Sequence, residues 1–266
     1  MFESAMPVFN RRIAVWNDTL ATAPTPDAES VKVSHEPGFA MPPRFPRTDV
    51  RVVDADTIDA ALQLAESSGR RPMVLNLADD CFPGGCVYTG SGAQEESLFR
   101  RTGLCRTLTL HFYPVRDGEA VYSPGVAVMK ASEARGFARL AQPWPTLDFL
   151  ACPALRHPQL DASGSGLREE DVARLEVKVE TVLQAAYKNG HGALVLGAMG
   201  CGAWRNPPHH VAQIMRRVLE RYPGAFADVH VAVLRDADGG VQLTRLRDRA
   251  DNLSAFQAAF ARAADP

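Results

Sequence analysis

Hydrophobic and polar positions along the chain follow two alternating periods. Short, mostly apolar runs are typical of strands, and longer segments with apolar residues every three or four positions are typical of helices. The runs predict strands at 49–56, 72–78, 118–130, 146–154, 193–196 and 228–237. The helical spacing predicts helices at 11–23, 57–69, within 161–190, from Pro207 or Pro208 onward, and at 252–264.

This alternation predicts an α/β fold, with a mixed, mainly parallel sheet between two helical layers. Residues 24–48 interrupt the pattern with many Pro, Ser and charged residues, which predicts an extended arm. We therefore expect two parts: an N-terminal helix and arm at 1–48, and one α/β unit at 49–266.

Composition narrows the function classes. Of the 266 residues, 46% are hydrophobic and 23% charged, and the net charge is −2, which is typical of an ordinary globular protein without a broad basic surface. We expect neither direct DNA binding nor membrane insertion, and no secretory signal is evident. The odd number of cysteines argues against a disulfide framework and predicts a reducing, cytoplasmic setting. The cysteines are Cys81, Cys86, Cys105, Cys152 and Cys201. We expect the protein to be a monomer.

Metal and cofactor chemistry is not indicated. The chain contains no CxxC pair, so we expect no structural zinc. Cys81 and Cys86 could meet a histidine (His191, His209 or His210), but the spacing fits no ligand pattern. A Cys201–His210 nucleophile pair has no third member in the sequence.

Two glycine-rich loops each follow an apolar run. The first lies in "NLADDCFPGGCVYTGSGAQEESLFRRTGL" (76–104), and the second is "GAMGCGAWRN" (197–206). Ligands of open α/β sheets bind at the carboxyl ends of strands, so the two loops are expected to line one cleft. The second loop leads into a helix, and glycines at a helix start favour phosphate. It matches neither the Walker loop nor the dinucleotide fingerprint, and a simple tight turn is the alternative.

Glu95 and Glu96 begin the helix after the first loop. Adjacent helical residues point roughly 100° apart, so the two carboxylates cannot flank one glycosidic bond from opposite sides. If the chemistry is glycosidic, one glutamate does the proton work and the other holds a sugar hydroxyl. The alternative is that both glutamates only stabilise the helix, because carboxylates are favoured at the positive end of the helix dipole.

The first loop resembles the signature of bacterial-type poly(ADP-ribose) glycohydrolases, a Gly-Gly-Gly run followed by a spacer and Gln-Glu-Glu. "YSPGVAV" (122–128) and "LGAMGCGAWRNPP" (196–208) resemble further motifs of that family in the same order. "RRIAVWNDTL" resembles its N-terminal helix. The resemblance implies a macrodomain: a three-layer α/β/α fold with an N-terminal helical extension, which binds ADP-ribose and hydrolyses the ribose–ribose bond of poly(ADP-ribose) without a cofactor. Its substrates would be the polymer or ADP-ribosylated proteins.

By position, the resemblance implies that Glu96 is the catalytic acid/base and that Glu95 holds ribose hydroxyls. Trp204 stands where the family usually has Phe. The substrate-binding residues that it implies are Asn76, Gly84, Gly85, Cys86, Gln94, Gly200, Cys201, Gly202, Ala203, Trp204 and Asn206.

Two positions depart from the family pattern, Cys86 at the third glycine and Arg205 where a glycine is expected. A positive φ at Cys86 would cost about 1 kcal/mol or block the site. The alternatives are an ADP-ribose-binding macrodomain without turnover, a hydrolase of mono-ADP-ribosyl or acyl-ADP-ribose substrates, and an unrelated nucleotide-binding enzyme. Phe82, Tyr88 and Tyr122 are candidate stacking partners for adenine, or packed aromatics.

Overall fold

The computed structural model describes residues 6–235 and 252–261. Seven strands form one mixed sheet in the order β1-β4-β5-β3-β6-β7-β2. Its strands are β1 (Val31–Ser34), β2 (Asp49–Val53), β3 (Met73–Asn76), β4 (Glu119–Ala127), β5 (Thr146–Ala151), β6 (Ala193–Gly197) and β7 (Asp228–Ala232). The α-helices are α1 (Met6–Thr22), α2 (Thr57–Ser68), α3 (Gln94–Arg101), α4 (Leu104–Thr107), α5 (Glu169–Lys188), α6 (Pro208–Glu220) and α7 (Asn252–Phe260). Short 3₁₀ turns are η1 (Val87–Thr89), η2 (Leu110–Phe112) and η3 (Glu133–Arg135).

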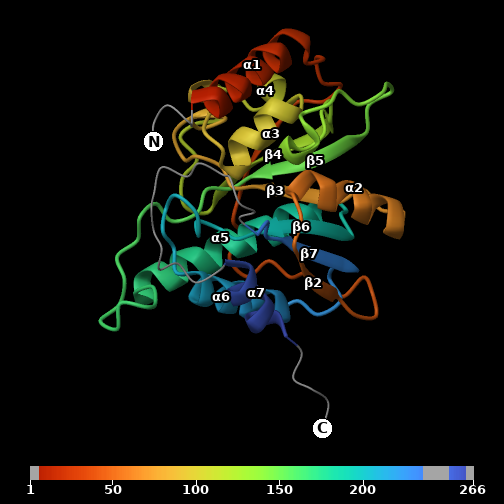
Figure 1. The fold of residues 1–266 in the computed structure, drawn as a ribbon. Coiled ribbons are helices and arrows are strands. Elements are labelled where there is room, and N and C mark those ends of the chain that lie inside the picture. The colour runs from red at the N-terminus through yellow and green to blue at the C-terminus, as the bar shows by residue number, and fades with distance from the viewer. Residues whose placement is uncertain (1–5, 236–251, 262–266) are drawn as a thin grey trace.

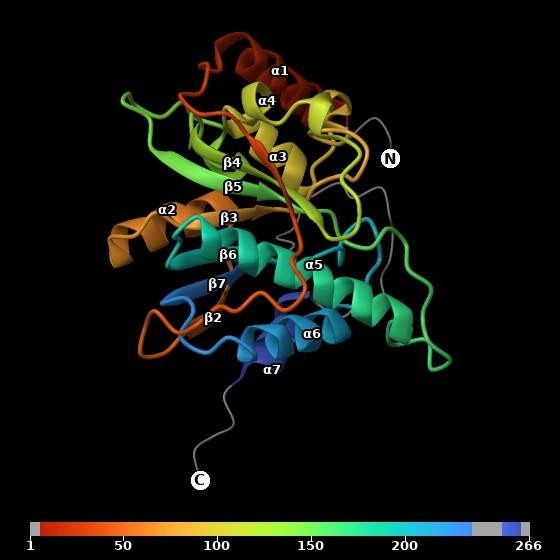
Figure 2. The same cartoon turned by 180° about the vertical axis from the view of Figure 1, so that it is seen from behind.

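The sheet is mainly parallel, as predicted. Strands β5, β3, β6, β7 and β2 run parallel to one another, whereas β4 pairs antiparallel with both β5 and β1. Helices lie on both faces: α5, α6 and α7 on one, and α2, α3 and α4 on the other (Figures 1 and 2). The three-layer α/β/α expectation is therefore confirmed.

Side-chain alternation along β3 shows why the sheet needs two helical layers. Met73 and Leu75 enter the core with α5 and α6, while Val74 enters the core with α2 and α3. All three side chains are 0% exposed. A strand that is apolar on both faces must be covered on both, which is the physical reason for the continuous apolar run in the sequence.

The N-terminal segments pack onto this body. Helix α1 lies over α3, with Trp16 and Phe99 at a ring-centroid distance of 6.2 Å (Figure 1). The arm contributes a strand that the sequence pattern did not predict, because Val31–Ser34 pairs with β4 as the edge of the sheet. Its exposed, partly charged side chains give no buried-strand signal.

Element ends differ from the predictions by a few residues. Strand β7 ends at Ala232 and helix α7 at Phe260, whereas the sequence predicted 237 and 264; residues 236, 237 and 262–264 lie outside the described residues. Asp56 caps α2, accepting hydrogen bonds from the backbone N–H groups of Ile58 and Asp59. In the described part of the chain, no helix is both long and apolar enough to cross a bilayer.

Candidate functional site

Both glycine-rich loops begin at the carboxyl ends of adjacent parallel strands, as the sequence predicted. Strands β3 and β6 are parallel neighbours, with Val74 opposite Val195, so the loops that follow Asn76 and Gly197 start side by side. This is the carboxyl edge of the parallel strands, where α/β folds place their ligands. Helix α3 begins at the same edge and carries both glutamates.

Glu95 is held by three donors. Its Oε1 accepts from Asn76 Nδ2 (3.2 Å) and from the Gly84 N–H (3.1 Å), and its Oε2 accepts from the Asp79 N–H (2.7 Å). The side chain is only 3% exposed. Burial raises the pKa of Glu95 to about 8, with the neighbouring Glu96 acting in the same direction and the three donors opposing it. Glu95 therefore fixes the first loop to the end of β3.

Glu96 is anchored through one oxygen only. Its Oε1 accepts a 3.1 Å hydrogen bond from the Cys86 N–H, while its Oε2 is buried and has no hydrogen-bond partner among the described residues. A buried carboxyl oxygen without a partner is costly unless a ligand completes it. Glu96 thus has one oxygen fixed by the loop backbone and one that no described protein group contacts by a hydrogen bond.

Close approach explains the two glycines of the first loop. Gly85 has φ +50, and a Cβ there would lie 2.8 Å from Glu96 Oε1; Gly84 has φ +77, and a Cβ would lie 2.6 Å from the Phe99 ring. Cys86 has φ −100, a conformation open to any residue. Cys86 therefore carries no positive-φ strain. Its side chain is exposed, and its backbone N–H donates to Glu96 Oε1.

Gln94 ties the start of α3 to strand β3. Its Oε1 accepts from the Leu77 N–H (2.9 Å), and its Nε2 donates to the Leu75 carbonyl (2.7 Å) and to Thr57 Oγ1 (3.4 Å). Its amide is thus used by the protein itself. Gln94 therefore holds the start of α3, with its two glutamates, against the end of strand β3.

The second loop is closed on itself by Asn206. This side chain is 2% exposed, and its Nδ2 donates to the carbonyls of Leu155 (2.7 Å) and Gly200 (3.2 Å). Gly200 has φ +71, and a Cβ there would lie 2.3 Å from Asn206 Nδ2, so only glycine fits. Of the other predicted residues, Gly202 and Ala203 are exposed, Trp204 is half-buried, and Cys201 is buried at 1% exposure.

Arg205 has φ +58. The left-handed backbone there explains why a glycine is expected at this position, and a non-glycine residue costs about 1 kcal/mol. Its side chain is exposed and does not narrow the loop from inside.

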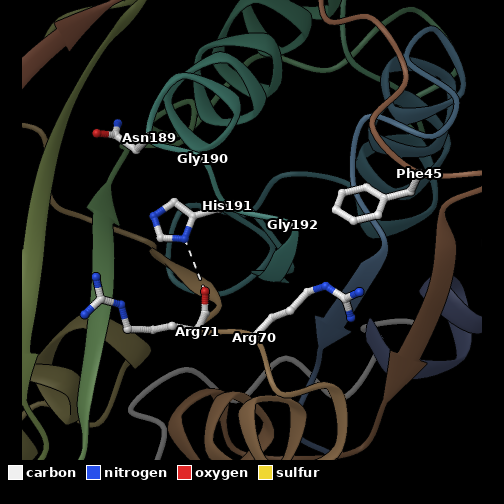
Figure 3. Close-up of a pocket in the computed structure, with 7 residues that line it drawn as sticks. All are labelled: Phe45, Arg70, Arg71, Asn189, Gly190, His191 and Gly192. Atoms are coloured by element: carbon white, nitrogen blue, oxygen red, sulfur yellow. Dashed lines mark hydrogen bonds between the residues drawn. The ribbon is translucent and has the colours of Figure 1, made fainter.

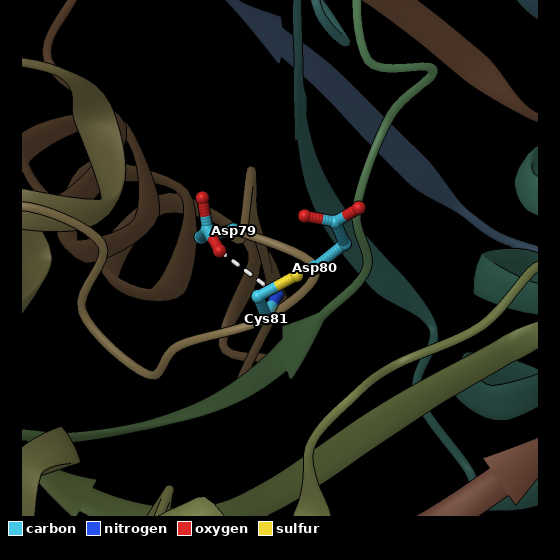
Figure 4. A group of neighbouring side chains, drawn as sticks. All are labelled: Asp79, Asp80 and Cys81. Carbon is cyan, nitrogen blue, oxygen red and sulfur yellow. Dashed lines mark hydrogen bonds between the residues drawn. The ribbon is translucent and has the colours of Figure 1, made fainter.

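Arg156, which the sequence did not single out, joins the two loops. Its guanidinium pairs with Asp79 (2.7 Å) and Asp80 in the first loop and stacks on the Trp204 ring in the second, 4.6 Å from the centroid. Asp79, Asp80 and Cys81 form one compact group (Figure 4). Because Arg156 already pairs with both carboxylates, we assign no metal to this group.

The arginines after the signature do not pair with Glu95 or Glu96. Arg101 is 1% exposed and binds Asp56 and Asp59 on α2 at 2.6 and 3.0 Å. Arg100 is fully buried, and its three guanidinium nitrogens have no hydrogen-bond partner within the described ranges. Burial lowers the pKa of Arg100 to about 10, and nearby Arg12 adds to this effect while Glu96 opposes it.

Several other candidates lie elsewhere. Tyr122 is not a stacking platform, because it is buried and its hydroxyl bonds His191 Nε2 at 2.9 Å. His191 instead borders a cavity at the amino end of β3 and β6, with Arg70, Arg71 and Phe45 (Figure 3). Phe82 and Tyr88 are 62% and 66% exposed on the first loop.

The proposed cysteine–histidine contacts are not formed. His210 Nδ1 accepts from the Leu167 N–H at 2.8 Å, and Cys201 Sγ donates to the Met199 carbonyl. Cys81 groups with aspartates rather than with any histidine of the described chain.

Comparisons with known proteins agree with the sequence resemblance. Residues 27–131 match the family model of the microbial-type PARG catalytic domain. The structure is similar to poly(ADP-ribose) glycohydrolase (PARG) from Thermomonospora curvata, with a TM-score of 0.74 and 26% identity over 94% of this chain and 100% of that one.

A second solved structure is that enzyme bound to the inhibitor ADP-HPD, with a TM-score of 0.73 and 27% identity over 94% and 100% of the two chains. A third is the Deinococcus radiodurans enzyme in complex with ADP-ribose, with a TM-score of 0.65 and 29% identity over 82% and 86%. No match was found among the curated proteins. The resemblance to bacterial-type poly(ADP-ribose) glycohydrolases and their macrodomain-type fold is therefore confirmed.

Proposed function

We propose that this protein hydrolyses the ribose–ribose glycosidic bond of poly(ADP-ribose) and releases ADP-ribose. The observation that carries this proposal is Glu96, whose Oε1 is fixed by the Cys86 N–H while its buried Oε2 has no partner among the described residues. Similarity to glycohydrolases that bind ADP-ribose and ADP-HPD supports the choice of ligand.

The substrate lies across both loops, at the carboxyl ends of the parallel strands. The diphosphate lies on the second loop, where the Gly200 turn brings backbone N–H groups close to the ligand at the start of α6. The distal ribose lies over Gly84 and Gly85, where no side chain stands between the backbone and the sugar. Asn76 Oδ1, buried and unpartnered in the described structure, accepts a hydrogen bond from a ribose hydroxyl.

Glu96 performs both proton transfers. Its Oε2 first protonates the leaving 2′-oxygen as the bond from that oxygen to the anomeric carbon breaks, which leaves an oxocarbenium-like sugar. A water molecule then attacks the same carbon and gives its proton back to Glu96. The products are free ADP-ribose and a shortened polymer, and the carboxylate ends in the state in which it began.

Glu95 positions the sugar rather than transferring the proton. Its two oxygens are already held by Asn76, Asp79 and Gly84, and its remaining lone pairs accept from ribose hydroxyls. A single acid/base also agrees with helical geometry, since neighbouring residues cannot face opposite sides of one bond. The proposed reaction uses no metal or other cofactor.

A comparison of substrates tests this proposal. Purified protein would be given poly(ADP-ribose), a protein carrying single ADP-ribose units, and O-acetyl-ADP-ribose, and released ADP-ribose would be quantified by chromatography. We expect release mainly from the polymer. Release only from the other two substrates would reassign the activity to a mono-ADP-ribosyl or acyl-ester hydrolase. Binding of ADP-ribose without release from any substrate would identify a binding module.

A further inference from the structure

Arg100 is a buried charge that the proposed reaction leaves unexplained. Its side chain is fully buried, and none of its three guanidinium nitrogens has a hydrogen-bond partner among the described residues. A charge buried without a partner is costly. The stability of the fold therefore does not explain why an arginine stands at this position, and a role in the site is the alternative.

Helical spacing places Arg100 one turn after Glu96. Both residues belong to α3 and are four positions apart, so they lie on the same face of the helix, in the order that favours attraction between an acidic and a basic residue. Glu96 is 7% exposed, and its Oε2 also lacks a hydrogen-bond partner in the described part of the chain. Two buried groups on one helical face thus share the same deficit.

The other charges near Arg100 cancel each other. Arg12 and Glu133 act on Arg100 together with Glu96. Arg12 comes from α1, which lies over α3 (Figure 1), and binds Glu133 at 2.9 Å. Burial lowers the pKa of Arg100 to about 10, with Arg12 acting in the same direction and both glutamates opposing it. The guanidinium therefore stays charged at neutral pH, and its effect falls on Glu96.

The titratable groups that face Glu96 do not offset this charge. They are Glu95 on the same helix and Cys86 on the first loop. Burial raises the pKa of Glu95 to about 8 and also raises the pKa of the Cys86 thiol above its usual value. Both groups are therefore mostly neutral at pH 7, where Arg100 is positive.

We propose that Arg100 is a positioning residue whose charge stabilises Glu96 as a carboxylate after Glu96 has given its proton to the leaving ribose oxygen. This inference rests on the proposed function, in which Glu96 passes through that state before water returns the proton. Charges interact more strongly in a buried site than in water, and a fixed charge needs no rearrangement during the reaction. Arg100 thus makes Glu96 a stronger acid and lowers the barrier to bond cleavage.

The alternative is that Arg100 only stabilises the last turn of α3, where the helix dipole favours a positive charge. The two roles differ in what they do to Glu96. A structural role changes the free energy of unfolding and leaves the titration of Glu96 where it was. The proposed role moves that titration.

The test measures the titration of Glu96 by NMR, in protein labelled with carbon-13 at the glutamate carboxyl carbons. The Glu96 signal is identified by its loss in Glu96→Gln. Arg100→Met removes the charge and keeps the length of the side chain, and we expect the titration midpoint to rise by about one pH unit. Arg100→Gln, a second neutral variant, should give the same shift. Arg100→Lys retains the charge and should keep the midpoint within about 0.3 pH unit of the natural protein.

The pH dependence of kcat/KM for release of ADP-ribose from poly(ADP-ribose) should change in the same direction. The proposed reaction begins with Glu96 protonated, so the rate falls as pH rises through its titration. Arg100→Met should move this fall about one pH unit higher. Because Glu96 becomes a weaker acid, the rate below the fall should drop roughly three- to tenfold.

Arg106→Met is the matched control, because it removes the same charge from the neighbouring helix α4. Arg106 is exposed and donates to the carbonyls of Leu20 and Ala23. Solvent screens an exposed charge, so the control should move neither the midpoint nor the pH dependence.

An unchanged midpoint in both neutral Arg100 variants, or an equal shift in Arg100→Lys, would overturn the proposed role. An Arg106→Met shift as large as that of Arg100→Met would overturn it too, since any lost positive charge would then suffice. A shift confined to the neutral Arg100 variants, in a protein whose unmodified form releases no ADP-ribose, would refute the proposed hydrolysis and leave the interaction between Arg100 and Glu96 standing.

Discussion

Gly85→Ala is the substitution that tests most sharply how the loop positions Glu96. Gly85 has φ +50, and an added Cβ would lie 2.8 Å from Glu96 Oε1 and 3.3 Å from Glu95 Oε2. Ordinary contacts are longer than about 3.4 Å, so the carboxylate of Glu96 must move by about half an ångström or more, away from the Cys86 N–H that holds it. Misplacement of a catalytic group on this scale costs about 100-fold in rate.

Stability must be separated from positioning. A non-glycine residue at positive φ costs about 1–2 kcal/mol. Gly69→Ala supplies the matched control, since Gly69 has φ +67 but an added Cβ would meet nothing within 4 Å. Both variants should lose about the same backbone contribution to the free energy of unfolding, and Gly85→Ala should lose somewhat more because of the contact with Glu96.

The assay is the initial rate of ADP-ribose release from poly(ADP-ribose), alongside urea unfolding of each variant. We expect kcat/KM to fall about 100-fold for Gly85→Ala and to stay within twofold for Gly69→Ala. If Gly85→Ala retained full activity while both variants lost stability as expected, then the position of Glu96 Oε1 would not matter and the reasoning would be refuted.

Three further predictions follow from the same contacts. Burial raises the pKa of Glu95 from 4.5 to about 8, so between these pH values the folded protein keeps a proton that the unfolded chain gives up, and the contribution of Glu95 to stability falls as pH rises. The unfolding free energy of wild type minus that of Glu95→Gln should therefore decline across this interval, by at most about 1.4 kcal/mol per pH unit. A pH-independent difference would contradict this. Cys86→Gly should not raise activity, because φ at Cys86 is −100; kcat/KM should stay within threefold, and a large gain would show that the cysteine side chain obstructs the site. Asn206→Ala removes a buried amide that donates to the carbonyls of Leu155 and Gly200. The free energy of unfolding, measured in urea, should fall by about 2 kcal/mol, and ADP-ribose binding should weaken. An unchanged Kd would show that the second loop does not contact the ligand.

The layered fold was predictable because its strands have a strong pattern. Buried runs such as 73–75 are apolar on both faces, and this is the signature of a parallel sheet between helices. The edge strand Val31–Ser34 was not predictable, since its side chains are mostly exposed and its partners in β4 lie 85 to 91 residues away along the chain. Tertiary pairing, rather than local preference, makes that segment a strand.

The candidate site was predictable in its residue types but not in their roles. The sequence placed Glu95 and Glu96 at the start of the helix after the first loop. It could not show that Glu95 accepts three hydrogen bonds while Glu96 Oε2 has no partner among the described residues. Cys86 looked damaging because sequence alone does not give φ. In the structure, Cys86 has an ordinary negative φ, and the positions that require glycine are Gly84 and Gly85.

Arg156 gave no signal in the sequence. Arginines outside a motif are usually solvated surface residues, and no local pattern says which loop they will face. Arg156 gains its role only when the segment after β5 meets Asp79 and Trp204. That meeting depends on sheet order, which the chain pattern does not specify.

The most direct measurement is the rate at which purified protein and its Glu96→Gln variant release ADP-ribose from poly(ADP-ribose), with the Kd of free ADP-ribose determined for both. The account predicts release by the natural protein, a loss of at least about 1,000-fold in the variant because an amide cannot exchange the proton, and a Kd within a few-fold. Equal release by the two proteins, or binding without release by either, would contradict the assignment of Glu96 as the acid/base of a glycohydrolase.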